Sequence, residues 1–127
     1  MRYLTKEQLL LVHSLVIDET GGVHGIRDAQ AVLSSEAAPR QSVFGKEMFP
    51  DIFQKAAAYA RGIFITRPFN DGNKRTALAA AAVFLAYNGY QFSAKEKASA
   101  QFFAKLSPDK FNLKALTSWL TQHVKKR

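Results

Sequence analysis

The sequence predicts a compact, all-α, single-domain helical bundle, and two features support this fold class. Apolar residues recur at helical spacing along most of the chain, and glycine, proline and capping residues divide it into short helices. The 127 residues suit one domain, which we expect to span residues 1–127. With 47% hydrophobic and 22% charged residues, the composition is typical of a folded globular protein rather than a disordered one.

The first predicted helix begins at Thr5. The tetrapeptide TKEQ is a capping box, in which Thr5 and Gln8 each bind the backbone at the other position. Glycines in the segment 20–25 end this helix, because glycine tolerates positive φ. Apolar residues at helical spacing are expected to face the core: Leu9, Val12, Leu15 and Val16.

A second helix, a loop and a third helix follow. The second helix runs from about Asp28 and stops at Pro39, because the residue before a proline disfavours helical geometry. Residues 39–49 show no clear period and predict an extended loop or a short hairpin. The third helix is expected to start with Pro50 as its first residue and Asp51 in its first turn. One face of it is apolar: Ile52, Phe53, Ala56, Tyr59, Ala60 and Ile63.

The second half of the chain is predicted to be helical too. Residues 76–87 are apolar almost all round, which indicates a helix buried on every side, ended by a left-handed cap at Asn88–Gly89. Residues 90–92 should form a short extended connector. Two more helices are expected at about 94–106 and 112–124. The inward face of the last one would contain Leu113, Leu116, Leu120 and Val124, with Trp119 beside them.

Charge and cysteine content limit the function. The net charge of +8 favours anionic partners such as nucleotides, nucleic acid or an acidic protein, with plain solubility as the alternative. The chain has no cysteine, which excludes disulfides, thiolate metal sites and cysteine nucleophiles. It shows no membrane-spanning run and no signal peptide, so we expect a cytoplasmic protein. A nucleic-acid partner is disfavoured, because no recognition motif is present.

The segment RPFNDGNKRTA, residues 67–77, contains the candidate residues for ligand binding and catalysis. It lies where the buried helix begins, and unpaired N–H groups at a helix N-terminus attract anions. Gly72 allows a tight turn toward a phosphate and Asn73 adds a side-chain donor, while Lys74 and Arg75 supply cations. Asp71 is the only carboxylate of the segment and suits Mg²⁺ bound together with phosphates. The alternative is a capped helix with a solvated turn.

The spelling RPFNDGNKRTALAA resembles the Fic/Doc family signature, H-P-F-x-D/N-G/A-N-K-R. GGVHGIRD, LSSEAAPRQSVFG, FPDIFQKAA and FLAYNGYQF also look like Doc-type sequence in the expected order, so the resemblance covers residues 1–92 well. The NKR ending resembles the death-on-curing (Doc) branch, since Fic enzymes more often have glycine where Lys74 stands. The resemblance implies a helical bundle whose motif loop lies between two central helices, with Phe69 anchoring the loop.

The resemblance also implies an activity. Fic enzymes transfer AMP to a protein hydroxyl, whereas the Doc branch transfers the terminal phosphate of ATP to a threonine of elongation factor Tu and stalls translation. On this chain Asp71 would hold Mg²⁺, and the residues Gly72–Arg75 would bind the phosphates of ATP. Residues 41–48 would correspond to a flap on which relatives lay the target peptide. The implied partner is an antitoxin whose disordered, often acidic tail folds onto the toxin.

The chain departs from the family pattern at Arg67, where relatives have the histidine that serves as general base. Arginine stays protonated and cannot accept the proton of an attacking hydroxyl, so transfer should be severely weakened. Arg67 is either an inactivating substitution or a feature of a natural pseudoenzyme that binds nucleotide or partner without turnover. Fic-type AMP transfer is a further alternative, which Lys74 disfavours by its bulk.

The three histidines of the sequence offer no metal site and no obvious substitute base. His13 lies in the amphipathic first helix and is expected to be a boundary residue between its buried and exposed faces, and His24 is expected in a surface turn. His123, near a helix C-terminus, suits the helix dipole. Their separation in the sequence gives no spacing typical of metal ligands.

Overall fold

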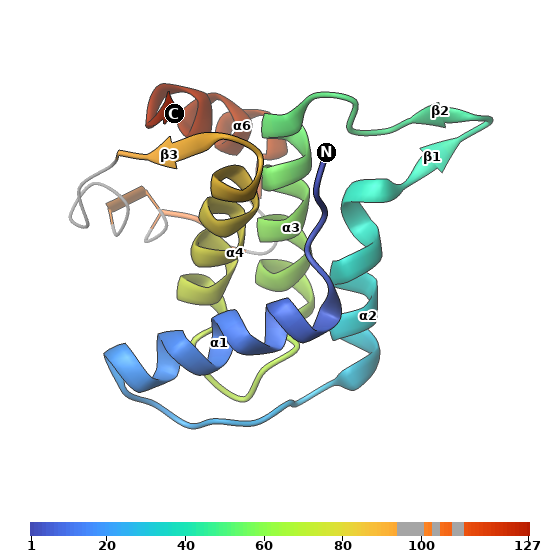
Figure 1. Cartoon of the computed structure of the whole chain (residues 1–127). Coiled ribbons are helices and arrows are strands. Elements are labelled where there is room, and N and C mark those ends of the chain that lie inside the picture. Colours follow the sequence, from blue (N-terminus) through green and yellow to red (C-terminus); the bar gives the residue numbers. More distant parts are fainter. Residues whose placement is uncertain (94–100, 103–104, 108–110) are drawn as a thin grey trace.

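The computed structural model describes residues 1–93, 101–102, 105–107 and 111–127, and the expected helical fold is confirmed within them (Figure 1). The helix expected at 94–106 lies largely outside the described residues. No described helix is long and apolar enough to cross a membrane. In chain order the elements are α1 (Lys6–Thr20), α2 (Ala29–Ala37), the 3-10 helix η1 (Ala38–Arg40), β1 (Ser42–Val43), β2 (Lys46–Glu47), α3 (Ile52–Thr66), α4 (Asn73–Tyr87), β3 (Tyr90–Phe92), α6 (Leu113–Gln122) and β4 (Val124–Lys126).

Helices α3 and α4 lie side by side at the centre of the molecule (Figure 1). Helices α2 and α6 pack against α3, and α1 crosses the end of the pair at which the loop 67–72 joins α3 to α4. Short side chains let the central helices approach closely, which places the start of α4 beside the end of α3. The completely buried alanines of the two helices are Ala56, Ala57, Ala60, Ala77, Ala80 and Ala81.

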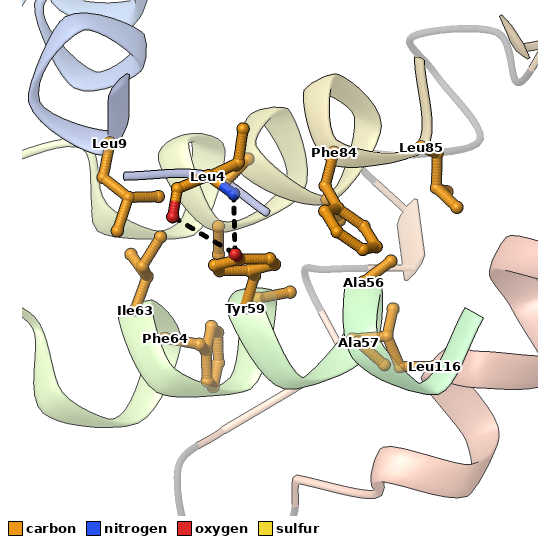
Figure 2. Close-up of a cluster of buried hydrophobic side chains, with 14 of the residues drawn as sticks. Leu4, Leu9, Ala56, Ala57, Tyr59, Ile63, Phe64, Phe84, Leu85 and Leu116 are labelled. Carbon is orange, nitrogen blue, oxygen red and sulfur yellow. Dashed lines mark hydrogen bonds between the residues drawn. The ribbon is translucent and has the colours of Figure 1, made fainter. Parts of the chain in front are cut away.

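The core collects apolar side chains from α1, α3, α4 and α6 (Figure 2). Tyr59 lies in its middle and is 0% exposed. Its hydroxyl accepts a hydrogen bond from the N–H of Leu4 (2.8 Å) and donates one to the carbonyl of Leu4 (3.3 Å). Burial raises the pKa of Tyr59 to about 12. This pair fixes the N-terminal segment onto α3.

Helix α1 confirms the predicted capping box and corrects the predicted core face. The Thr5 side chain accepts from the Gln8 N–H, and the Gln8 side chain accepts from the Thr5 N–H. Leu15 was expected inside, but it is 57% exposed. The buried face instead continues through His13 and Ile17, because these positions follow Leu9 at intervals of four residues, close to one helical turn.

Helix α3 begins at Ile52, two residues later than expected, because Asp51 is its N-cap rather than a residue of its first turn. The Asp51 carboxylate accepts from the N–H groups of Phe53 (2.7 Å) and Gln54 (3.4 Å), and the Gln54 side chain accepts from the Asp51 N–H. A carboxylate N-cap satisfies two of the first-turn N–H groups that have no partner within a helix. The predicted core face of α3 is confirmed, with Ala56, Tyr59, Ala60 and Ile63 at 0% exposure.

Two further expectations about the second half are corrected. Helix α4 is fully buried along one side only, and its other side is half-buried at Leu78 and Val83. The last helix ends at Gln122, and Val124 belongs to a short strand, β4, that pairs antiparallel with β3. Pairing with β4 satisfies backbone groups of residues 90–92, which a longer α6 would leave without this partner. Gly89, with φ 93°, follows the end of α4 in the left-handed region as expected.

Candidate active site

The loop 67–72 is bounded by two residues in left-handed geometry. Arg67 ends α3 as its C-cap with φ 50° and ψ 63°, and its N–H donates to the Ile63 carbonyl (3.0 Å). Gly72 is the N-cap of α4 with φ 72°. A Cβ atom at Gly72 would lie 2.9 Å from Cδ1 of Ile17, so this turn requires glycine for both its conformation and its space.

The segment 22–28, which we call the supporting segment, holds the loop from one side. The backbone N–H groups of Arg27 and Asp28 both donate to the carbonyl of Pro68, at 2.8 Å and 3.0 Å. The N–H of Asn70 donates to the carbonyl of Gly25 (3.1 Å). The loop therefore pairs with a segment that precedes it by about 40 residues, and these hydrogen bonds fix its backbone without a ligand.

Phe69 and His13 form the apolar base of the loop. Phe69 is 1% exposed, and its ring stacks on the imidazole of His13 with 3.8 Å between centroids and 4° between planes. Nε2 of His13 donates to the carbonyl of Asp71 (2.9 Å), and it carries the proton because a carbonyl only accepts. The expectation that His13 is a boundary residue is wrong, since its side chain is 4% exposed. Its spacing to Leu9 and Ile17 was the signal that indicated burial.

The carboxylate of Asp71 is oriented by two backbone donors. Oδ1 accepts from the N–H of Gly72 (2.9 Å), and Oδ2 accepts from the N–H of Val23 (3.2 Å). A Cβ atom at Gly22 would lie 2.6 Å from Oδ2 of Asp71, so glycine gives the carboxylate its place. Each oxygen keeps lone-pair capacity for one further partner, which is what a cation bound at the edge of the pocket would require.

Asn73 closes the loop on itself. Its Oδ1 accepts from the N–H of Phe69 (3.1 Å), and its Nδ2 donates to the carbonyl of Phe69 (2.9 Å). The side chain is 8% exposed. Sequence reasoning assigned this amide to a ligand, whereas in the structure it fixes the shape of the turn that opens α4.

A pocket of about 580 Å³ lies over the start of α4. The side chains of Arg67, Lys74 and Arg75 give it a positive lining, to which Asp71 adds one carboxylate. Nζ of Lys74 lies 5.7 Å from the ring centroid of Phe64, an apolar part of the wall. The pocket thus brings together every sequence-predicted site residue except the anchor, with these lining residues: Phe64, Arg67, Asn70, Asp71, Gly72, Asn73, Lys74, Arg75, Leu106 and Ser107.

Other candidate residues lie outside the pocket. Nε2 of His24 contacts the carboxylate of Asp18 at the surface (2.9 Å), and Nδ1 of His123 contacts the carbonyl of Trp119 (2.6 Å). Among the described residues no group of three His, Cys, Asp or Glu side chains could hold a metal ion. Any Mg²⁺ here would accordingly need ligands from its substrate in addition to Asp71.

The segment expected to act as a flap forms the β1–β2 hairpin, in which Ser42 pairs with Glu47 and Val43 with Lys46. This confirms the hairpin alternative of the sequence prediction. The hairpin projects near the start of α3, whereas the motif loop follows its end (Figure 1). A helix of 15 residues spans about 22 Å, so the hairpin forms no wall of the pocket.

Comparisons with known proteins agree with this geometry. Residues 3–85 match the model of the Fic/DOC family. The chain is 37% identical over 92 residues to "Toxin Doc" of Mycolicibacterium smegmatis, covering 72% of this chain and 68% of that protein. It is 35% identical over 94 residues to "Protein kinase doc" of Escherichia phage P1, covering 72% of this chain and 71% of that protein. The chain belongs to the Fic/DOC family.

Proposed function

We propose that this chain is a Doc-type toxin whose fold transfers the terminal phosphate of ATP to a hydroxyl of a protein involved in translation. The observation that carries the proposal is the pocket, in which the N-terminus of α4 and three cationic side chains meet one carboxylate. Such a set suits a polyphosphate, because phosphoryl transfer depends mainly on positioning and on stabilising negative charge. The names of the two relatives, a toxin and a protein kinase, support the same reaction.

We assign phosphate binding and Mg²⁺ binding to different residues of the pocket. The N-terminus of α4, which starts directly after Gly72, and the cations of Lys74 and Arg75 would bind the phosphates of ATP. Asp71 would hold Mg²⁺ together with those phosphates, and the bound ion would neutralise charge that develops during transfer. One carboxylate with free lone pairs fits this ion, because Mg²⁺ takes few protein ligands when phosphates supply the others.

In our proposal, Arg67 impairs the phosphate transfer that this chain would catalyse. The family's general base would stand at this position, in the pocket lining that also includes Asp71 and Arg75. An arginine there cannot take the proton from the attacking hydroxyl, and the loss of a general base costs about 10²–10⁴-fold in rate. The guanidinium is instead one more cation for the phosphates, so nucleotide binding should persist. A pseudoenzyme that binds nucleotide or antitoxin without turnover is the alternative that Arg67 favours.

The proposed setting is that of a toxin–antitoxin pair in the cytoplasm. The net charge of +8 suits an acidic, disordered segment of an antitoxin that folds on binding. A target resembling elongation factor Tu is the substrate that we propose.

One paired assay tests the proposal. The chain and its Arg67→His variant are incubated with Mg²⁺, purified elongation factor Tu and ATP labelled at either the γ- or the α-phosphate. We expect only the variant to label the target, and only from the γ-phosphate. Label from the α-phosphate would assign AMP transfer instead. If the variant labels nothing while both forms bind nucleotide, the chain is a binding module and the transfer proposal fails.

A further inference from the structure

We propose that Arg27 is a positioning residue for the side chain at position 67. Arg27 does not line the pocket, so it acts through the backbone on the position where the family's general base would stand. The kinetic part of this inference rests on the proposed phosphate transfer, and its geometric part does not.

Arg27 binds three consecutive carbonyl groups around position 67. Its Nε donates to the carbonyl of Arg67 (2.6 Å), and its Nη2 donates to the carbonyl of Thr66. Its backbone N–H donates to the carbonyl of Pro68 (2.8 Å). One residue thus determines the direction of three peptide groups, which no other contact of the loop does among the described residues.

Position 67 needs such support because its backbone is strained. A left-handed conformation is unfavourable for a residue other than glycine, and Arg67 has φ 50°. The last carbonyls of α3 would also lack partners, since no further helical turn follows them. The planar guanidinium of Arg27 supplies two parallel donors and a positive charge at the negative end of the helix.

The consequence concerns the direction of the side chain at position 67. Peptide orientations at residues 66–68 determine the Cα–Cβ direction at 67, and that direction leads into the pocket beside Asp71. Because Arg27 donates to backbone carbonyls at residues 66–68, it would act in the same way on arginine or on histidine at position 67. Lysine could reach one carbonyl but lacks the fork that binds two, so it should replace Arg27 only in part.

The kinetic test uses the Arg67→His protein as its background and adds Arg27→Gln, Arg27→Lys or the control Arg61→Gln. Arg61 is an exposed arginine of α3 outside the pocket. We expect Arg27→Gln to lower kcat about 10- to 100-fold, because small misplacements of a reacting group are costly. The KM for ATP should change by less than about threefold, Arg27→Lys should lie between, and the control should match its background. An unchanged kcat, or a loss confined to KM, would overturn the proposal.

A spectroscopic test remains valid even if the Arg67→His protein transfers nothing, in which case only the proposed function fails. The imidazole introduced by Arg67→His is followed by NMR of histidine-labelled protein. We expect one sharp set of its signals in that variant and a broadened or multiple set once Arg27→Gln is added, with Arg61→Gln as the control. Identical sharp signals with and without Arg27 would overturn the inference. If Arg27→Gln does not fold, the same comparison with Arg27→Lys decides.

Discussion

The described chain contains two residues other than glycine with positive φ, Phe44 and Arg67, and the structure holds them in different ways. Phe44 (φ 51°) precedes Gly45 (φ 79°) in the two-residue turn of the β1–β2 hairpin. Two adjacent positive φ values are the geometry of tight hairpin turns, so neighbouring strands alone explain this one. Arg67 (φ 50°) is instead the left-handed cap of α3, and its carbonyl is bound in addition by Arg27 from far along the chain.

The same contrast extends to how each segment meets the rest of the protein. In the motif loop, Pro68 and Phe69 are buried, and backbone groups on both sides of them bind the supporting segment. The hairpin is exposed along both strands and is tied at its base, where Nζ of Lys55 contacts a carboxylate oxygen of Glu47 (2.9 Å). Preorganisation is therefore concentrated at the pocket, as the proposed phosphate binding would require, while the hairpin is only tethered.

The largest expected difference between the two segments concerns their phenylalanines. Phe69→Ala should lower the free energy of unfolding by about 3–5 kcal/mol, because it removes a buried ring stacked on His13. Phe44→Ala should change it by less than about 0.5 kcal/mol, because the Phe44 side chain is fully exposed. Urea unfolding of both variants measures these values. Equal losses at the two positions would contradict the comparison.

Alkaline pH should act on the part of α3 that contains Lys55 and Tyr59. The pKa of Tyr59 is about 12 in the folded protein and about 10 unfolded, so the folded state retains the proton. The contribution of Tyr59 to the free energy of unfolding is complete below pH 10 and is lost as the pH rises through 12. This loss lowers the free energy of unfolding by about 2–3 kcal/mol. Burial alone would lower the pKa of Lys55, but Glu47 and Tyr3 raise it, so loss of its charge acts in the same direction.

Urea unfolding at pH 9, 10, 11 and 12 tests this dependence. Tyr59→Phe should flatten the profile and keep only the part due to Lys55, at the cost of the hydrogen bonds with Leu4. A profile of Tyr59→Phe that falls as steeply as that of the parent protein would show that another group is responsible.

The smallest expected difference concerns two glycines, Gly22 of the supporting segment and Gly45 of the hairpin. Gly22 has φ 119°, and an added Cβ would meet Oδ2 of Asp71 at 2.6 Å. Gly22→Ala should lower the free energy of unfolding by about 1–3 kcal/mol and weaken binding of Mg²⁺ with ATP, because the Asp71 carboxylate must move. Gly45→Ala in the hairpin meets nothing within 4 Å, so it should cost only about 1 kcal/mol of strain and leave ATP affinity unchanged. Calorimetric titration with Mg²⁺ and ATP separates the two, and equal affinities would refute the role given to Gly22.

Local patterns predicted much of this molecule. The capping box at Thr5, the core face of α3 and the start of α4 at the motif follow from residue types and spacing, because helices form from contacts within a few residues. Errors occurred where a distant partner decided the outcome. Val124 leaves the helix to pair with Phe92, and His13, whose spacing indicated a buried position, stacks on the distant Phe69.

The sequence by itself determined the helical fold class, the position of the motif at a helix N-terminus and the charges that face the pocket. Only the tertiary structure decided the shape of the loop and the direction of the side chain at position 67. The reason is that the partners of this loop, Arg27 and Gly25 among them, precede it by about 40 residues. Hydrogen bonds over such a separation depend on how α1, α3 and α4 pack, and no local pattern of residues 67–72 contains that information.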